Sequence, residues 1–168
     1  MATFHKPSAL AHISVLDLTG PEGNLCGKIL ADLGADVTKI EPPDGDKSRK
    51  IGPFATGVNQ PDFSLYFANY NTNKYSVMLD LESREGVNRF IELSEKVDVI
   101  IENFRPGYMN QIGIGFERLS LNNPGIVMAS ISPFGQTGPY SSFIGDELIV
   151  QAMGGVMYCQ GDEMKPPC

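Results

Sequence analysis

The sequence contains little of what metal sites, disulfide frameworks and membrane spans require. It has only two histidines, both near the N-terminus, and three cysteines, Cys26, Cys159 and Cys168, without the spacing of metal ligands. We therefore expect no bound metal, and we expect a reducing, cytoplasmic environment. No apolar run approaches the roughly 20 residues that cross a bilayer. The N-terminus also lacks the basic and then apolar pattern of a signal peptide.

Positive charge is scarce as well. The chain has 13 Lys and Arg against 20 Asp and Glu, and this net charge of −7 argues against nucleic acid as a partner. A small anionic ligand remains compatible with it, because such a ligand needs only a local positive field. With 42% hydrophobic and 20% charged residues, the composition is that of a soluble globular protein with one full core.

What the sequence does contain is an alternation of strand and helix patterns. Apolar segments predict five strands, at residues 13–18, 35–41, 75–81, 97–104 and 126–132. Apolar residues at helical spacing predict helices at 24–33, 63–70, 83–93, 107–112, 116–119 and 146–158. This order predicts an α/β, Rossmann-like fold with a mostly parallel sheet and helices on both faces. We expect residues 1–168 to form one domain that is cut short at its C-terminal end, because the tail resembles a connection.

Residue types add two local expectations. Asn24 is a candidate N-cap of the first helix. The polar segment 42–61 predicts a surface loop in which the basic residues Lys47, Arg49 and Lys50 are solvated, with a functional loop as the alternative.

The segment 97–104 has the pattern of a strand that opens onto a site. Four of its first five residues are Val or Ile, which predicts burial on both faces, and the sequence then changes abruptly to Glu102 and Asn103. In open α/β sheets, ligands bind outside the carboxyl ends of the strands. The segment is therefore a candidate edge of a site, with a plain strand and turn as the alternative.

Common catalytic motifs are missing. The sequence has no Gly-x-Ser-x-Gly elbow, no Walker loop and no Cys–His pair at a suitable spacing. The glycines after the first strand do not follow the spacing of a dinucleotide-binding loop. Four carboxylates stand at strand ends or near a helix start, where capping or surface charge is the alternative to catalysis: Glu41, Glu102, Asp146 and Glu147. Residue patterns alone identify no nucleophile.

Four parts of the sequence nevertheless carry a family resemblance. They are VLDLTGPEG…LADLGADVTKIEPPDGDKSR, SLYFANYNTNKYSVMLDLESREG, VDVIIENFRPGYM…IGIGFERLSLNNPGIVMASISPFGQTGPY and GDELIVQAMGGVMYCQGD. In their order and spacing, the chain resembles the N-terminal part of the large domain of the class III CoA-transferases. This CaiB/BaiF family includes formyl-CoA transferase, carnitine CoA-transferase and α-methylacyl-CoA racemase.

The resemblance implies an enzyme that moves coenzyme A between carboxylic acids. Its substrates would be an acyl-CoA and a carboxylic acid, and the CoA thioester would lie over the strand ends within a homodimer of interlocked chains. In the family, an aspartate attacks the acyl-CoA and forms a mixed anhydride and then a CoA thioester, which divides one difficult exchange into easier steps. That aspartate is expected beyond Cys168, so residues 1–168 would contain no catalytic residue and would be inactive alone.

The resemblance also implies which residues contact CoA. The matching positions are Pro21, Glu22, Gly23, Leu79, Asn103, Phe104 and Arg105. Some relatives place basic residues on the CoA phosphates where this chain has Glu82, Gln111 and Ile144. The expected replacements for those cations are Lys39, Arg49, Lys74 and Arg105.

Two alternatives remain open. The racemase branch of the family uses a histidine where this chain has Asp146, and a racemase needs a suitable base on each side of the α-carbon. CoA transfer is therefore favoured over an acyl-CoA racemase or isomerase with other bases. The other alternative is a non-catalytic homologue that binds CoA or dimerises. The sequence does not identify the acyl donor or the acceptor.

Overall fold

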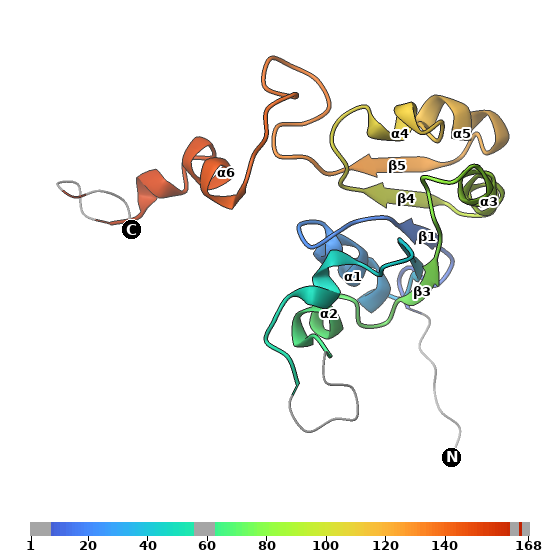
Figure 1. Cartoon of the computed structure of the whole chain (residues 1–168), viewed down its shortest axis with the longest axis horizontal. Helices are drawn as coiled ribbons and strands as arrows, with labels where there is room; N and C mark the ends of the chain where they lie inside the picture. The colour runs from blue at the N-terminus through green and yellow to red at the C-terminus, as the bar shows by residue number, and fades with distance from the viewer. Residues whose placement is uncertain (1–7, 56–62, 162–164, 166–168) are drawn as a thin grey trace. The chain divides into compact units, whose positions relative to one another are not determined.

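The computed structural model describes residues 8–55, 63–161 and 165. Cys168, most of the predicted connection at 161–168 and the end of the predicted loop at 42–61 lie outside the described residues. The chain divides into two compact units, Met1–Ile131 and Ser132–Cys168, and each is described by itself. Figure 1 traces the chain and labels most of its helices and strands.

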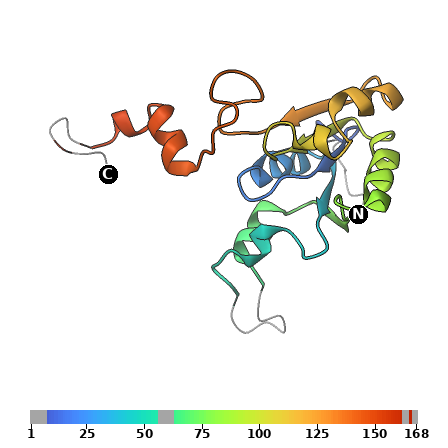
Figure 2. The ribbon, with the colours of Figure 1, turned by 45° about the horizontal axis from the view of Figure 1, so that its top comes forward.

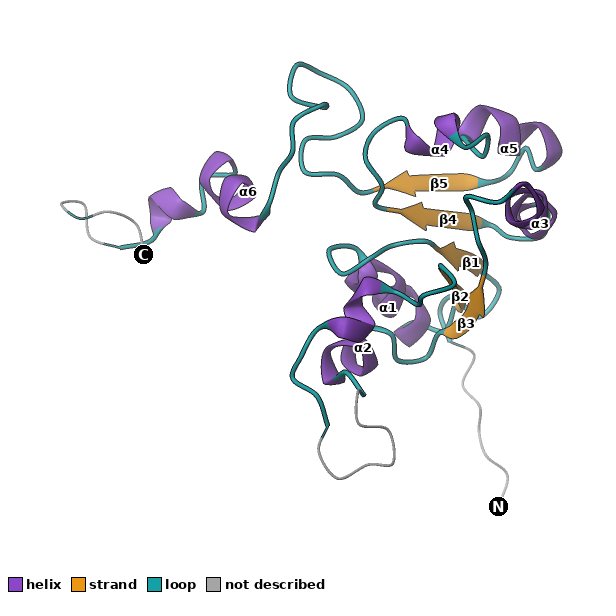
Figure 3. Ribbon diagram, in the orientation of Figure 1, coloured by secondary structure: helices purple, strands orange, loops and turns teal. Residues whose placement is uncertain are grey.

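The first unit is built on a sheet of five parallel strands in the order β3-β2-β1-β4-β5 (Figure 3). The strands are β1 (Ser14–Asp17), β2 (Asp36–Glu41), β3 (Tyr75–Met78), β4 (Val99–Glu102) and β5 (Val127–Ser130). All five predicted strands are present, and the prediction of a Rossmann-like α/β fold is confirmed. Because every strand runs in the same direction, their carboxyl ends lie at one edge of the sheet.

Helices cover both faces of this sheet. Successive side chains of a strand point to opposite faces, so each face has its own set of buried side chains. Leu16 and Ile100 pack with Phe90 on the first face, whereas Val15 packs with Ala31 on the second. All five side chains are buried. Burial on both faces explains why the strands appear in the sequence as continuous apolar runs.

The helices of this unit are α1 (Asn24–Asp32), the 3₁₀ turn η1 (Lys47–Lys50), α2 (Leu65–Tyr70), α3 (Arg84–Ser94), α4 (Tyr108–Gln111) and α5 (Phe116–Asn122). Helices α3, α4 and α5 supply core residues to the first face, and α1 supplies them to the second. Figures 1 and 2 show this arrangement from two directions. The helices predicted in this part of the chain are therefore present. α1, α2 and α4 are shorter than predicted, α3 is shifted by one residue, and α5 extends to Asn122.

Helix α1 departs from the cap prediction. Its N-cap is Gly23, which has no side chain to offer, and Asn24 is the first helical residue. The prediction of Asn24 as N-cap is wrong, because its fully buried side chain bonds to other segments. The helical spacing itself is correct, although Leu25, Ile29 and Leu33 are each about half exposed.

The second unit contains α6 (Glu147–Met153) and the 3₁₀ turn η2 (Met157–Cys159). Asp146 caps α6, since its side chain accepts the backbone N–H of Ile149, so the capping alternative for this carboxylate is confirmed. The helix predicted at 146–158 stops at Met153. Gly155 follows with φ of +81°, a left-handed conformation that commonly ends helices at glycine.

Candidate functional site

A pocket opens at the carboxyl ends of four strands in the first unit. Its volume is about 640 Å³, which is in the range of small-molecule sites. The walls come mainly from the segments that follow β1, β2, β3 and β4, at residues 18–22, 42–47, 79–82 and 103–108. The strand order reverses between β1 and β4, because β2 and β3 extend the sheet in one direction and β4 and β5 in the other. Ligands of open α/β sheets bind in the crevice at such a point.

Five of the seven residues predicted to contact CoA line this pocket. They are Pro21, Glu22, Leu79, Asn103 and Phe104. Gly23 is buried, and a Cβ at this position would approach the Cβ of Thr19 to 2.6 Å. Arg105 is exposed, and its guanidinium donates to Gln111 Oε1 at 3.1 Å. The structure thus brings together residues from the ends of three strands and leaves Gly23 and Arg105 outside the lining.

The side chain of Asn103 connects the end of β4 to the turn after β1. Its Oδ1 accepts the backbone N–H of Gly20 at 2.7 Å, and its Nδ2 donates to Glu22 Oε2 at 3.1 Å. These two bonds use both ends of the amide and fix its orientation. The crevice between the two strands therefore has a defined wall.

A buried carboxylate and two aromatic rings in tilted contact fix the end of β4. Glu102 is 3% exposed and accepts the backbone N–H of Phe104 at 2.7 Å. It is therefore neither a surface charge nor part of the pocket lining. The rings of Phe104 and Tyr108 lie with centroids 4.8 Å apart, and both line the pocket. Tyr108 is absent from the sequence prediction, and no helical spacing marks it, because Phe104 precedes α4 and Gly107 between them is left-handed.

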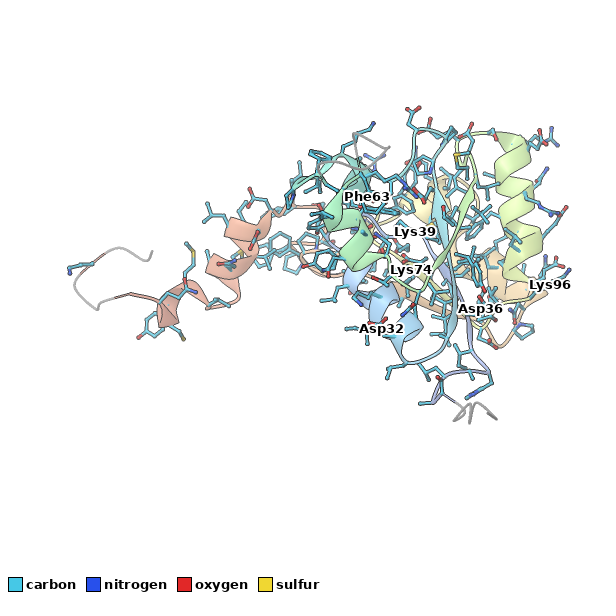
Figure 4. All side chains as sticks on the ribbon, turned by 90° about the horizontal axis from the view of Figure 1, so that it is seen from below. Asp32, Asp36, Lys39, Phe63, Lys74 and Lys96 are labelled. Carbon is cyan, nitrogen blue, oxygen red and sulfur yellow. The ribbon has the colours of Figure 1, made fainter. Side chains whose placement is uncertain are left out.

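Two lysines that were expected to bind phosphate are buried instead. The side chains of Lys39 and Lys74 are 1% exposed, and Figure 4 shows both in the interior. Lys74 Nζ pairs with Asp17 Oδ2 at 2.8 Å and donates to Asn24 O and Asn71 Oδ1, both at 2.9 Å. Burial lowers the pKa of Lys74, and the Asp17 carboxylate opposes this effect.

Lys39 is also fully engaged. Its Nζ donates to Thr19 O at 2.6 Å and to Asn24 Oδ1 at 2.8 Å, and it pairs with Asp46 Oδ2 at 3.2 Å. A protonated amine has three hydrogens, and here each has a partner. The prediction that Lys39 and Lys74 neutralise CoA phosphates is therefore wrong, because both charges are already balanced inside the domain.

Arg49 forms a bidentate pair with Glu41. Its Nε and Nη2 donate to Oε2 and Oε1 at 2.6 and 2.7 Å, and the guanidinium lies 3.7 Å from the centroid of the Phe67 ring. Burial raises the pKa of Glu41, but hydrogen bonds from Arg49, Ser76 and the Asp46 backbone outweigh burial and hold the pKa at about 2. Glu41 is therefore not a surface charge. Arg49 is exposed, as predicted, but the prediction that it is free to bind phosphate is wrong, because its guanidinium is already paired with Glu41.

The charge on the pocket lining is mostly negative. Lys47 is the one cation among the described lining residues, and its side chain is exposed. Asp46 is balanced by Lys39. Four further carboxylates line the pocket: Glu22, Asp44, Asp80 and Glu82. An anionic ligand therefore meets a lining of its own sign.

The described residues give no sign of a metal centre or a membrane span. Across 8–55 and 63–161, no group of three or more His, Cys, Asp or Glu could hold a metal ion. In the same part of the chain, no helix combines the length and the apolar character that crossing a membrane requires. Cys26 and Cys159 are free thiols, and burial raises the pKa of Cys26.

The fold and the pocket together define a Rossmann-like α/β domain with a cavity where the strand order reverses. The comparison with known families gives the particular assignment. The chain belongs to CoA-transferase family III, whose family model matches residues 10–168. The family resemblance found in the sequence is thereby confirmed.

Individual relatives agree with this assignment. An acetyl-CoA:oxalate CoA-transferase of Acetobacter aceti is 44% identical over 158 residues, covering 91% of this chain and 39% of that protein. Subunit BbsE of a succinyl-CoA:(R)-benzylsuccinate CoA-transferase of Thauera aromatica is 37% identical, over 91% of this chain and 37% of the relative. The crystal structure of a CaiB/BaiF family protein from Brucella suis matches with a TM-score of 0.88 at 35% identity, covering 97% of this chain and 43% of that one. The chain thus spans about 40% of the length of these relatives.

Proposed function

We propose that this chain is the CoA-binding part of an enzyme that transfers CoA between carboxylic acids. One observation carries the proposal: five family positions for CoA contact, distant in sequence, line one pocket where the strand order reverses. The family and the names of the relatives support the reaction. CoA would lie over the strand ends, with apolar groups against Leu79 and Phe104 and polar groups toward Asn103.

The proposed chemistry is covalent catalysis by a carboxylate. An aspartate attacks the thioester carbonyl of the acyl-CoA, expels the CoA thiolate and becomes a mixed anhydride. The thiolate attacks the aspartyl carbonyl, which releases the first acid and leaves an aspartyl-CoA thioester. The second acid displaces the thiolate to form a new anhydride. The thiolate then attacks the new acyl carbon, which gives the product acyl-CoA and restores the aspartate.

We place this aspartate outside residues 1–168, so these residues alone would bind CoA without turnover. The buried carboxylates at the strand ends and beside them support this placement, because they already have partners within the domain: Asp17, Glu41, Asp46 and Glu102. The length of the relatives supports it too, since this chain spans less than half of each.

The proposal includes a homodimer of interlocked chains in the cytoplasm. Apolar side chains exposed on α1, at its C-cap and on the edge strand β3 support an assembly that covers them: Leu25, Ile29, Leu33, Tyr75 and Met78. Light scattering on the full-length protein tests this part, and a mass of one chain would refute it.

The activity test compares the full-length protein with residues 1–168. Acetyl-CoA and succinyl-CoA serve as donors, oxalate and other dicarboxylic acids serve as acceptors, and chromatography detects the new acyl-CoA. We expect turnover only in the full-length protein, with mass spectrometry locating CoA on one aspartate, and CoA binding by calorimetry in both. Turnover by residues 1–168 would refute the placement of the nucleophile. A full-length protein that neither turns over nor binds CoA would refute the function.

The acidic lining favours a second candidate, a non-catalytic relative retained for binding or dimerisation. Glu82 and its neighbouring carboxylates would repel the phosphates of CoA. The activity test decides between the two, because CoA transfer by the full-length protein contradicts the second candidate, and calorimetry shows whether CoA binds despite the acidic lining. An isomerase would instead exchange deuterium at the substrate α-carbon, and the role of Asp146 as the cap of α6 supports transfer over isomerisation.

A further inference from the structure

One cluster of buried polar side chains joins two of the four segments that form the pocket. The segments are 18–22, after β1, and 42–47, after β2. The cluster, called the Asn24 cluster below, consists of Thr19, Asn24, Lys39, Asp46 and Ser48, each at most 6% exposed. Of these five residues, only Asp46 lines the pocket.

Lys39 and Asn24 make the connections. From β2, Lys39 Nζ donates to Thr19 O at 2.6 Å in the first segment and pairs with Asp46 Oδ2 at 3.2 Å in the second. From the start of α1, Asn24 accepts Lys39 Nζ on Oδ1 at 2.8 Å and donates from Nδ2 to Ser48 Oγ at 3.1 Å. Ser48 donates its backbone N–H to Asp46 Oδ1 at 2.8 Å. The two side chains therefore join the turn after β1, the start of α1 and the segment after β2.

Stability alone gives little reason for such a cluster. Well-packed apolar side chains in place of a buried ion pair are often as stable or more stable, because they avoid removing charges from water. The same strand already buries apolar residues at Val37 and Ile40. The directional bonds of Lys39 instead fix the position of the turn after β1 relative to the segment after β2.

We propose that Asn24 and Lys39 are positioning residues for CoA. Without touching the ligand, they hold the segments 18–22 and 42–47 in the relative placement that CoA requires. This inference rests on the proposed function, because the pocket must be the place where CoA binds. Loss of the cluster should weaken the binding of the CoA substrate and leave the acceptor acid unaffected.

The test uses the full-length protein and its Asn24→Leu variant, which keeps a side chain of similar size and removes both hydrogen-bonding groups. We expect the KM for acyl-CoA to rise about 10- to 100-fold, the scale of losing a buried bond to a charged group. We expect kcat and the KM for the acceptor acid to stay unchanged. A merely structural role would reduce the active fraction, and so lower the apparent kcat at constant KM, which would overturn the proposal.

Asn123→Leu is the matched control. Asn123 Nδ2 donates to Ser94 O at 3.0 Å and to Val97 O at 2.8 Å, so this variant also loses an amide with two protein partners, near the amino end of β4. Its KM for acyl-CoA should equal that of the wild type, and a rise equal to that of Asn24→Leu would overturn the proposal. Ser48→Ala, which removes one bond of Asn24, should raise the KM less and replaces Asn24→Leu if that variant does not fold.

A separate measurement distinguishes failure of the inference from failure of the proposed function. If the wild-type protein transfers CoA and Asn24→Leu has the same KM, only the inference fails. If the wild-type protein has no turnover, calorimetry compares the Kd of CoA in the two proteins, and a higher Kd in Asn24→Leu supports positioning. Equal Kd values, or no CoA binding by the wild type, overturn it.

Discussion

Replacing Glu41 with Gln should make the free energy of unfolding less dependent on pH in acid. The Glu41 carboxylate is 1% exposed, and its pKa is held at about 2, against an ordinary value of 4.5. The hydrogen bonds from Arg49 and Ser76 favour the ionised form of Glu41 by more than burial disfavours it. One pKa unit corresponds to 1.36 kcal/mol, so this carboxylate contributes roughly 3 kcal/mol of stability when it is ionised.

The direction of the pH dependence follows from the lowered pKa. The contribution is complete well above pH 4.5, where the carboxyl group is ionised in both the folded and the unfolded state. It decreases as the pH falls and is lost near pH 2, where the folded protein also takes up the proton. Gln is neutral at every pH and has nearly the shape of protonated Glu. Glu41→Gln should therefore be less stable than the wild type by roughly 3 kcal/mol at pH 7, with a gap that narrows as the pH falls and nearly closes near pH 2.

Urea denaturation followed by circular dichroism between pH 7 and pH 3 measures this difference. Glu92→Gln is the matched control, because Glu92 also pairs with an arginine, Arg89, at 2.6 Å, but both side chains are more than 60% exposed. Exposed pairs contribute little to stability, so this variant should follow the wild type at every pH. A gap between wild type and Glu41→Gln that stays the same from pH 7 to pH 3 would refute the reasoning.

Other substitutions test the core, a buried ion pair and the pocket lining. Phe90→Ala removes a ring that is 0% exposed and should lower the free energy of unfolding by about 3–5 kcal/mol in urea denaturation; a loss under ~1 kcal/mol would contradict the packing. Gly27→Ala places a Cβ 2.2 Å from Asp17 Oδ2, so it should disturb the ion pair between Asp17 and Lys74 and lower the free energy of unfolding by about 3–5 kcal/mol. An unchanged urea midpoint would show that this ion pair is dispensable. Glu82→Gln removes one negative charge from the pocket lining and should lower the KM for acyl-CoA about 2- to 5-fold. Added salt should also lower the KM of the wild type, because it screens the repulsion between the lining and the CoA phosphates. A KM that rises with salt would contradict an acidic pocket.

The strands, their parallel arrangement and the edge that carries the pocket could be predicted from the sequence. Burial on both faces leaves apolar runs, and the polar residues that follow each run mark its carboxyl end. Since parallel strands end at the same edge, Leu79 and Asn103 could be placed together without any knowledge of their contacts. The family resemblance supplied the residue types to look for at those ends.

The buried charges could not be predicted, because their partners are distant or of unexpected type. Lys74 and Asp17 are 57 positions apart, and no local pattern distinguishes a paired buried lysine from a free one. In β2, Lys39 lies in a strand that is buried on both faces, so strand periodicity does not place it either. Asn24 has the residue type of an N-cap, but its amide bonds to Lys39 and Ser48, and the cap position is left to a glycine.

The amines of Lys39 and Lys74 each have a partner for all three hydrogens, so their chemical reactivity can report when the domain unfolds. Acylating reagents react with an accessible, unprotonated Nζ, whereas Lys39 and Lys74 are buried with every N–H engaged. The exposed Lys47 and Lys50 should be labelled at once in the native protein. The two buried amines should be labelled only as fast as the domain unfolds around them, so mass spectrometry of their peptides would time that event. In 168 residues without a tryptophan, these lysines can take the place of the usual fluorescent probe.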